Sequence, residues 1–351
     1  MRVAVIGAGA VGSVVGGLLA RAGEDVTLVG RRAHVDAVNR DGLQIDGALG
    51  ALRVRVRAAE RLDVRPELAL LAMKTQGVEA AARELRPQLA GVPVVTMQNG
   101  VRSDGLVAGV LGRDQLLSCV VLFGATFLEP GRVTYSPPGS LVLGVPFGPL
   151  DERARTVAAL LARAVPTRLS ADIAGAHWTK LVVNENNALP AVTGLSIQEV
   201  NRRPALRRLS VLLMREAVAA IAAAGIRLAS LPRLPAVGVR TMLALPMPLA
   251  SRLLGVLSRS LGSTPALGST LQSVRRGEQT EIDYLNGEVV ALGGRTGTPT
   301  PCNAAVVELV HRVEETGRFL TEAEVTAAVD RASAAGGRGG RGGRRRRTFR
   351  P

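Results

Sequence analysis

The stretch VAVIGAGAVGSVVGGLLARAG, residues 3–23, decides the fold of this chain. Its β-branched start, residues 3–6, predicts a strand, and the glycines that follow predict a tight turn. Small apolar residues from 10 to 22 then predict a helix, and a second strand is expected over residues 26–29. A strand, a glycine-rich turn, a helix and a second strand in this order are typical of a dinucleotide-binding unit.

The turn has the spacing of the dinucleotide fingerprint and consists of Gly7, Ala8, Gly9, Ala10, Val11 and Gly12. The first glycine permits the tight turn, the second lets the backbone approach a pyrophosphate, and the third lets helix and strand pack closely. The N–H groups at the start of the helix then face the phosphates. We therefore predict that these six residues bind a dinucleotide cofactor. A purely structural glycine-rich turn is the alternative.

The end of the second strand selects between the two nicotinamide cofactors. A site for NAD usually places an Asp or Glu there, which binds the ribose 2′-hydroxyl. Here the sequence GRR occupies positions 30–32, and no acidic residue occurs before Asp36. Guanidinium groups bind phosphate in a bidentate manner, so this pattern favours a 2′-phosphate. We predict NADPH/NADP+ as the cofactor, with Arg31 in contact with it and Arg32 solvated.

The rest of the chain predicts two domains and a tail. Strand-like runs over 68–73, 92–97, 117–122, 132–135 and 141–145 alternate with helical stretches such as 78–89, which indicates an α/β domain with a parallel, Rossmann-like sheet over residues 1–169. From residue 170 to 335 the pattern is helical, with helices expected over 173–189, 203–224, 265–276, 281–292, 303–315 and 322–335, so an all-α domain for substrate binding and dimerisation is predicted.

Two segments fit this division less well. Residues 227–264, rich in Pro, Leu and Met, predict either a helical insertion or a mobile apolar flap. Residues 336–351 contain seven arginines, repeated glycines and no acid, which predicts a disordered Arg/Gly-rich tail. Such a tail gives salt-sensitive, sequence-independent contact with nucleic acid. We interpret it as an incidental solvated extension and expect no specific nucleic-acid partner.

Composition excludes several classes of protein. With 47% apolar and 21% charged residues, the 351-residue chain is neither disordered nor fibrous. Aromatic residues make up only 2%, which argues against base stacking on single strands. Two cysteines and three scattered histidines predict no disulfide framework and no metal site. The longest apolar run is interrupted by Arg252 and two prolines, so no membrane span is expected and the predicted compartment is the cytoplasm.

Lysine usage points to two positions. Of 44 lysine and arginine residues, only Lys74 and Lys180 are lysine. Arginine evidently serves wherever a positive charge is enough, whereas lysine is a compact donor whose pKa shifts readily toward neutrality. The two lysines are therefore candidates for chemistry that arginine does not perform. Chance retention at the surface is the alternative.

The segment TKLVVNENN, residues 179–187, predicts a helix with a polar face. At about 100° per residue, Lys180, Asn184 and Asn187 fall on one side of it, as in a pocket wall. A solvated stripe is the alternative. Lys74 and Asn99 follow predicted strands, and the carboxyl ends of parallel strands line the ligand crevice of such sheets. Both lysines are therefore expected at one cleft.

Together these motifs resemble one known family. The fingerprint, the strand end at Met73 and Lys74, the QNG of residues 98–100, the Lys180 helix and the TEIDYLNG of residues 280–287 are similar to those of 2-dehydropantoate 2-reductase (ketopantoate reductase), in the same order. The resemblance runs from residue 1 to about 315. It implies NADPH-dependent reduction of 2-dehydropantoate to (R)-pantoate in pantothenate and coenzyme A biosynthesis, with a small keto acid as partner and, commonly, a homodimer.

The resemblance also implies roles for individual residues. Lys180 matches the catalytic lysine, and Lys74 and Asn99 match residues on the cofactor side. Asn184 and Ser269 match substrate-binding positions. Glu281 matches the acidic residue near the nicotinamide end, which would make it a catalytic and cofactor-binding residue that holds either the ribose or the lysine.

Two features of the substrate side need a structural answer. The family places a second asparagine four residues after the first, but this chain has Ala188 there, so Asn187 is predicted to replace it. Otherwise the chain reduces a different keto acid or an imine with the same cofactor. Ser269 and Glu281 would lie roughly 18 Å apart on one unbroken helix, so a break at Gly277 is expected. A capping or surface hydroxyl is the alternative for Ser269.

Overall fold

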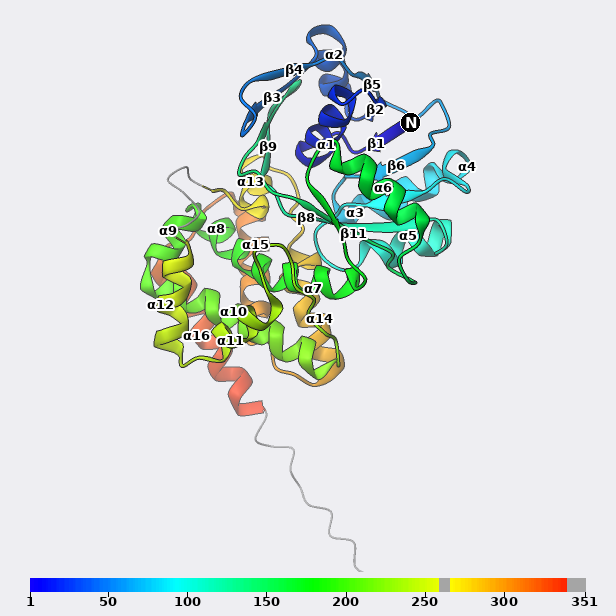
Figure 1. Ribbon diagram of the computed structural model, residues 1–351. Coiled ribbons are helices and arrows are strands. Elements are labelled where there is room, and N and C mark those ends of the chain that lie inside the picture. The colour runs from blue at the N-terminus through cyan, green and yellow to red at the C-terminus, as the bar shows by residue number, and fades with distance from the viewer. Residues whose placement is uncertain (259–265, 340–351) are drawn as a thin grey trace, which may run out of the picture. The chain divides into compact units, whose positions relative to one another are not determined.

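The computed structural model describes residues 1–258 and 266–339, and for the last four of these the backbone alone. The chain forms two compact units (Figure 1). The N-terminal unit comprises Met1–Lys180 and Leu228–Pro235, and the C-terminal unit comprises Leu181–Arg227 and the chain from Ala236 onward.

An eight-stranded sheet forms the centre of the N-terminal unit. Its strand order is β12-β11-β8-β7-β6-β1-β2-β5. The strands are β1 (Arg2–Ile6), β2 (Asp25–Val29), β5 (Arg57–Ala59), β6 (Leu68–Leu71), β7 (Val94–Thr96), β8 (Leu116–Val121), β11 (Leu141–Gly144) and β12 (Thr167–Leu169). All neighbours pair in parallel except β8 with β11. The predicted Rossmann-like parallel sheet is confirmed, with one antiparallel pair near its edge.

Both faces of this sheet are buried, as a parallel sheet requires. Along β1, Val3 and Val5 belong to one apolar cluster, and Ala4 and Ile6 belong to another. The first cluster includes side chains of α1 (Ala10–Arg21), α2 (Arg32–Asp41) and α6 (Glu152–Ala162). The second includes side chains of α3 (Thr75–Glu84), α4 (Arg86–Leu89) and α5 (Ser103–Leu111). Because side chains alternate along a strand, the all-apolar run of β1 serves both layers.

A smaller sheet of four strands, in the order β4-β3-β10-β9, completes the unit. It consists of β3 (Leu43–Gly47), β4 (Leu52–Val54), β9 (Ala125–Glu129) and β10 (Arg132–Tyr135). The run predicted as a strand at 132–135 therefore belongs to this sheet and not to the parallel one. Its strands are short and half-polar, so their sequences carry a weak local signal.

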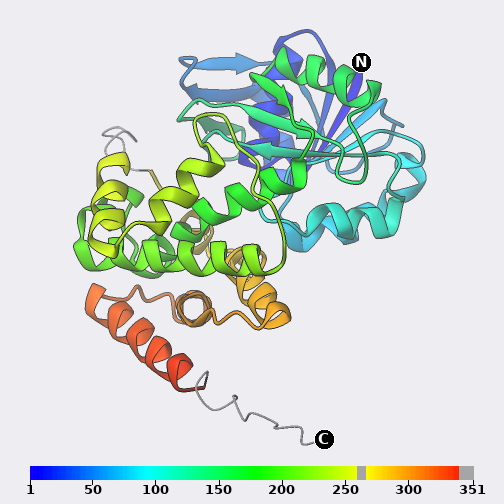
Figure 2. The same cartoon turned by 60° about the horizontal axis from the view of Figure 1, so that its bottom comes forward.

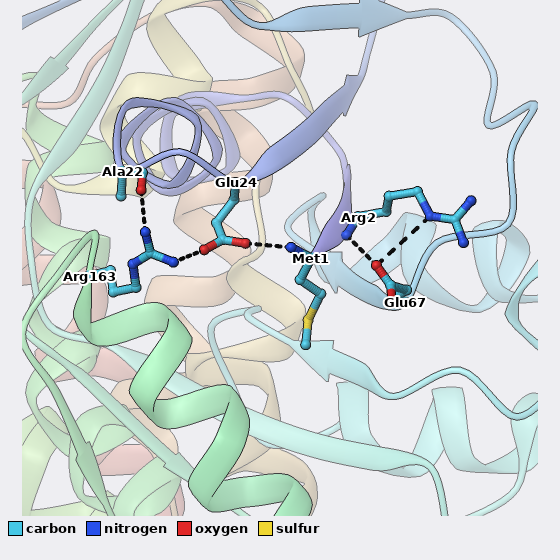
Figure 3. Close-up of polar contacts among 6 residues, drawn as sticks. All are labelled: Met1, Arg2, Ala22, Glu24, Glu67 and Arg163. Carbon is cyan, nitrogen blue, oxygen red and sulfur yellow. Dashed lines mark hydrogen bonds and ion pairs between the residues drawn. The ribbon is translucent and has the colours of Figure 1, made fainter.

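Ion pairs fasten the start of the chain and the end of α6 to the turn between α1 and β2 (Figure 3). The Met1 ammonium lies 2.7 Å from the Glu24 carboxylate, which also pairs with Arg163. The Arg163 guanidinium donates a further hydrogen bond to the Ala22 carbonyl. On the other side, the backbone N–H of Arg2 donates to Glu67 at 2.7 Å. These contacts hold β1, and with it the start of the glycine turn, in place.

The described part of the C-terminal unit contains helices and no strand. Its elements are η1 (Glu185–Asn187), α8 (Ala188–Thr193), α9 (Ile197–Arg202), α10 (Pro204–Ala223), α11 (Ala236–Ala244), α12 (Met247–Ser258), α13 (Ser269–Arg275), η3 (Ile282–Tyr284), α14 (Asn286–Thr296), α15 (Pro301–Thr316) and α16 (Glu322–Gly339). Figure 2 shows α16 as the last of these helices. An apolar cluster built from α8, α9, α10, α15 and α16 forms the core of this unit. The predicted all-α second domain is confirmed.

The division between the units falls later than the predicted boundary at residue 169. The helix α7 (Ile173–Asn184) begins in the N-terminal unit, where Ile173 and Ala176 pack against Val120 and Val142 of the sheet. Leu231 packs in the same cluster, which explains why Leu228–Pro235 belongs to that unit. Because the start of α7 is buried against the sheet, the N-terminal unit includes α7 as far as Lys180.

The structure answers part of what the sequence left open about two segments. Residues 236–258 form α11 and α12, so the described part of the 227–264 segment is largely helical, and residues 259–264 lie outside the described residues. The helix α16 continues to Gly339, so the first four residues of the predicted tail are helical. The rest of that tail lies outside the described residues. Among the residues described, no helix has both the length and the apolar character that a membrane crossing demands.

Candidate functional site

The register of the large sheet brings four strand ends into one row. Ile6 of β1 pairs with Val29 of β2 and Leu71 of β6, and Leu71 pairs in turn with Thr96 of β7. Because these strands are parallel, the segments that follow them leave the sheet at the same edge. Ligands of open α/β sheets bind at this carboxyl edge. The glycine turn, the predicted Arg31, Lys74 and Asn99 positions are therefore brought together by the backbone alone.

The glycine turn has the geometry that its sequence predicted. Gly7 has φ +95°, and a Cβ there would lie 2.4 Å from the backbone nitrogen of Met73. A Cβ on Gly12 would lie 2.4 Å from the Gly7 carbonyl oxygen, so turn and helix pack as closely as backbone allows. Gly9 differs, because a Cβ there would meet nothing within 4 Å in the described part of the chain. The open side of the turn is thus at Gly9.

The start of α1 is suited to an anion. Gly9 is the N-cap of this helix; no described side chain caps it and no acidic residue lies in its first turn. The first N–H groups of a helix have no partner within the helix and carry a partial positive charge. An open backbone approach at Gly9 in front of these N–H groups fits the pyrophosphate of a dinucleotide.

The end of β2 presents arginine and no acid. Gly30 follows β2 directly, and a Cβ there would lie 3.0 Å from the Cβ of Ala8, so this turn packs against the glycine turn. Arg31 is the exposed N-cap of α2. Arg32 is exposed and lies 3.8 Å from Asp36 one turn further along the helix. A nearby carboxylate thus accompanies Arg32. The contact of Arg31 with the cofactor stays a prediction.

The strand ends of β6 and β7 are tied to each other by a buried glutamine. The side-chain amide of Gln98 donates to the carbonyl of Leu71 at 2.8 Å and to that of Met73 at 3.1 Å. The Thr75 hydroxyl donates to the Asn99 carbonyl at 3.1 Å. Gln98 is 4% exposed and is therefore a structural clamp. Gln98 fixes the backbone before Lys74, and the Thr75 hydrogen bond links the residue after Lys74 to Asn99.

Lys180 meets the strand-end row directly. Its Nζ donates a hydrogen bond to the Oδ1 of Asn99 at 2.7 Å. Lys180 lies on α7 and is half-buried. In the sheet, β7 lies two places from β1, which corresponds to roughly 10 Å between the Asn99 strand and the glycine-turn strand. A lysine ammonium thus sits within the N-terminal unit beside the edge where a dinucleotide would lie.

A buried chain of polar side chains lies next to this lysine. The Ser118 hydroxyl donates to Oδ1 of Asp104 at 2.9 Å and lies 2.7 Å from Nε2 of His177. The Thr96 hydroxyl also donates to Asp104. Ser118 and His177 are 0% and 4% exposed. The sequence alone does not indicate these residues, because their positions on α5, β8 and α7 are far apart along the chain.

Asn184 and Asn187, which are predicted to bind the substrate, lie where α7 gives way to a 3₁₀ turn. The α-helix ends at Asn184 and continues as a 3₁₀ turn, Glu185–Asn187. In a 3₁₀ helix the side chains at i and i+3 eclipse, so Asn184 and Asn187 share a face. Ala188, the position of the family's second asparagine, is fully buried in the core of the C-terminal unit. The 3₁₀ turn agrees with the role predicted for Asn187, which stays a prediction.

Asn187 and Ser269 lie close together in the C-terminal unit. A Cβ on Gly268 would lie 2.8 Å from Oδ1 of Asn187, and Gly268 immediately precedes Ser269 at the start of α13. The helix α13 ends at Arg275, and Gly277 follows with φ +63°. The expected break between Ser269 and Glu281 is confirmed.

Glu281 lies at the start of a 3₁₀ turn and not on a long helix. It precedes the 3₁₀ turn η3, and the helix expected over 281–292 begins only at Asn286. The N–H of Thr280 donates to Glu314 at 2.7 Å, and His311 lies between Glu314 and Asp283 at 2.9 and 3.0 Å. Although burial lowers the pKa of His311, these hydrogen bonds raise it overall. The role of Glu281 remains a prediction.

A buried carboxyl group lies between the two asparagines. Glu185 is 0% exposed, and neither of its carboxyl oxygens has a hydrogen-bond partner among the described residues. Burial, together with the nearby charge of Glu216, raises the pKa of Glu185 well above its usual range. Glu216 itself accepts hydrogen bonds from the N–H groups of Cys302 and Asn303. Burial therefore disfavours the charged form of the Glu185 carboxyl group.

A hollow in the N-terminal unit lies away from the strand-end row. It has a volume of about 350 Å³ and is lined in part by Gly91, Gln115 and Arg153. These residues precede β7 and β8 or lie on α6, so the hollow is at the amino edge of the sheet. Parallel sheets bind ligands at the other edge, and we assign no function to this hollow. Among the described residues, no group of three potential metal ligands occurs.

Comparison with known proteins gives consistent matches over nearly the whole chain. The family model described as ketopantoate reductase PanE/ApbA matches residues 3–146, and the model of its C-terminal part matches residues 172–314. A 2-dehydropantoate 2-reductase of Pyrococcus horikoshii is 28% identical over 321 residues, which cover 90% of this chain and 99% of that protein.

Solved structures agree with these matches. The crystal structure of a PanE/ApbA family ketopantoate reductase from Ralstonia eutropha is 31% identical, with a TM-score of 0.75, and the match covers 90% of this chain and 99% of that one. D-mandelate dehydrogenase, solved with NADH and anilino(oxo)acetate, is 21% identical with a TM-score of 0.77 over 90% and 99% of the two chains. At that identity the second match shows the shared fold alone.

Proposed function

This chain belongs to the ketopantoate reductase PanE/ApbA family and is an oxidoreductase that uses a pyridine nucleotide and a keto acid, and we propose that it reduces 2-dehydropantoate to (R)-pantoate with NADPH. The observation that carries this proposal is the hydrogen bond between Lys180 and Asn99 at the strand-end row. The product would serve the biosynthesis of pantothenate and coenzyme A.

The reaction asks three things of the protein. A bound NADPH supplies the hydride for the carbonyl carbon. Lys180 donates a proton to the oxygen that becomes the hydroxyl, since an ammonium is an acid that arginine does not replace. Asn99 accepts a hydrogen bond from Nζ and thereby orients the remaining protons of the ammonium. Holding acid and carbonyl in one geometry avoids the entropy cost of bringing them together.

The other assignments follow from the family motifs. We assign the pyrophosphate to the turn from Gly7 to Gly12, and the nucleotide's remaining contacts to Lys74 and Asn99. Asn184 and Asn187 bind the substrate, and Ser269 binds its carboxylate. Glu281 binds the ribose or Lys180. The closeness of Asn187 to the backbone before Ser269 supports a shared role for these two residues.

Cofactor choice gives a direct test. Changing Arg31 to alanine is expected to raise KM for NADPH by about 10- to 150-fold, because a charged hydrogen bond to phosphate contributes roughly 1.5–3 kcal/mol. KM for NADH should change less than about twofold, since NADH lacks the 2′-phosphate. Steady-state kinetics with both cofactors measures this. The matched control is Arg32→Ala, and equal effects of the two variants would contradict the assignment of Arg31.

Substrate choice is tested at Asn187. Changing it to alanine should raise KM for 2-dehydropantoate by about 10-fold or more, because a buried polar contact to the substrate is left unmade. KM for NADPH should be unaffected. The neighbour Asn186 is the control, since its amide is directed at Met214 of α10. Its alanine variant should keep the parent KM.

A different keto acid or an imine is the second candidate, favoured by Ala188 in place of the family asparagine. Rates of NADPH oxidation with 2-dehydropantoate and with a panel of keto acids and imines separate the two. The proposal requires that kcat/KM be highest for 2-dehydropantoate. A tenfold preference for another substrate, with Lys180 still required, would replace it with this second candidate.

A further inference from the structure

Asp104, Ser118 and His177 form a connected series of polar side chains, buried at Ser118 and His177 and half-buried at Asp104. The Ser118 hydroxyl donates to the Asp104 carboxylate, as the Thr96 hydroxyl does. The Ser118 oxygen also lies 2.7 Å from Nε2 of His177, within hydrogen-bond distance.

His177, at the end of this series of side chains, contacts the turn that carries Asn99 and lies on the helix that carries Lys180. His177 precedes Lys180 by three residues on α7, nearly one helical turn, so the two share a helix face. The imidazole also hydrogen-bonds the backbone of Gly100, the residue after Asn99. Gly100 is buried and has φ +86°, a turn conformation that few other residues adopt. His177 thus links the helix that carries the ammonium to the turn that carries its acceptor.

Two charged groups act on His177, the Asp104 carboxylate and the Lys180 ammonium. Burial lowers the pKa of His177, the Asp104 carboxylate raises it and the Lys180 ammonium lowers it, so the imidazole is neutral at pH 7. Cys119 on β8 is fully buried, and burial raises its pKa to about 12, so it adds no charge. Asp104 also raises the pKa of the Cys119 thiol, and Lys180 lowers it. One anion and one cation therefore act on a shared buried region.

We propose that Asp104, Ser118 and His177 are positioning residues for the reduction, which hold the Asn99–Gly100 turn against α7 and direct a negative charge toward the Lys180 ammonium. This inference rests on the proton-donor role proposed for Lys180. None of the three need touch the substrate or the cofactor. Their contribution is to keep the ammonium charged and aimed, because a misplacement of about 1 Å at a reacting group costs on the order of 100-fold in rate.

The test compares the purified full-length parent with His177→Leu, His177→Gln, Ser118→Ala and Asp104→Asn in pH-dependent steady-state kinetics. His177→Leu and Ser118→Ala should lower kcat by about 10- to 100-fold, with KM for NADPH within about threefold of the parent. His177→Gln should restore most of kcat, because its amide carries both a donor and an acceptor for a hydrogen bond with Ser118. Asp104→Asn should shift the alkaline fall of kcat to lower pH by about half a unit to one unit, since an anion that favours the ammonium is lost.

Thr179→Val is the structural control. Thr179 is fully buried on the same helix and donates to the carbonyls of Gly175 and Ala229. It is not part of the series of side chains formed by Asp104, Ser118 and His177. It should lower the melting temperature without moving the pH profile. If the four variants at His177, Ser118 and Asp104 fold and keep the parent's kcat and pH profile, the inference is wrong. It is also wrong if His177→Gln is as slow as His177→Leu. If Lys180→Ala retains the parent's turnover, the proposed function fails first, and the two failures are thus distinguished.

Discussion

Replacing Lys180 by alanine is expected to lower kcat by about 10²- to 10⁴-fold, the usual contribution of a positioned proton donor. Binding of NADPH should change little, because the glycine turn lies on β1 and Lys180 contacts the sheet two strands away. Single-turnover oxidation of NADPH with 2-dehydropantoate, combined with a fluorescence titration of NADPH, measures the two effects separately. The parent's kcat should itself fall as pH rises and the ammonium loses its proton.

The arginine variant decides what the lysine supplies. A guanidinium at position 180 keeps the positive charge and the ability to donate to Asn99, but it is a poor acid near neutral pH. Lys180→Arg should therefore be nearly as slow as Lys180→Ala. Arg168→Ala, which removes an exposed cation on β12, is the control and should have the parent's kcat. A Lys180→Arg enzyme with more than about a tenth of the parent's kcat would mean that charge alone is required.

Much of the N-terminal part of this site could be predicted because its signals are local. The β-branched run before Gly7 indicates a strand that leads into the glycine turn. The GRR after Val29 indicates a second strand that ends beside arginine side chains. Once the strands are parallel and in register, their ends must meet at one edge. The lysine count supplied the remaining step, and the contact between Lys180 and Asn99 agrees with it.

The features that escaped prediction depend on distant parts of the chain or on a small change of helix geometry. His177 has no local signal, because its partners Ser118 and Asp104 are 59 and 73 positions away. The 3₁₀ turn after Asn184 interrupts what is otherwise a good helical pattern. It buries the carboxyl group of Glu185, whose oxygens have no hydrogen-bond partner in the described part of the chain. A charged residue is the type least expected there, since an isolated buried carboxylate is too costly to remain ionised.

The same 3₁₀ turn changes how the missing asparagine should be understood. On a continuous α-helix, position 188 would lie beside Asn184, and its alanine would count against the family's substrate. On the observed turn, Ala188 faces the core of the C-terminal unit and Asn187 shares the face of Asn184. We therefore propose that Asn187, and not residue 188, contacts the substrate beside Asn184.

Gly9→Ala should weaken NADPH binding by about 100-fold, or ~2.7 kcal/mol, while the protein still folds. The added Cβ meets nothing within 4 Å in the described part of the protein, so any loss of affinity comes from the space that the ligand would need. Fluorescence titration with NADPH and thermal unfolding measure the two properties. Because alanine is a poorer N-cap than glycine, a cost of up to about 1 kcal/mol in stability is expected.

Two further glycines provide the comparison that gives this prediction its force. Gly105 on α5 also has open space where a methyl group would be added, so Gly105→Ala should leave both stability and NADPH binding unharmed. Gly12→Ala should instead destabilise the protein, because its Cβ would collide with the Gly7 carbonyl. Of these three positions, Gly9 alone separates folding from binding. A folded Gly9→Ala protein with the parent's affinity for NADPH would remove the glycine turn as the pyrophosphate site, and the cofactor would have to bind elsewhere on the sheet edge.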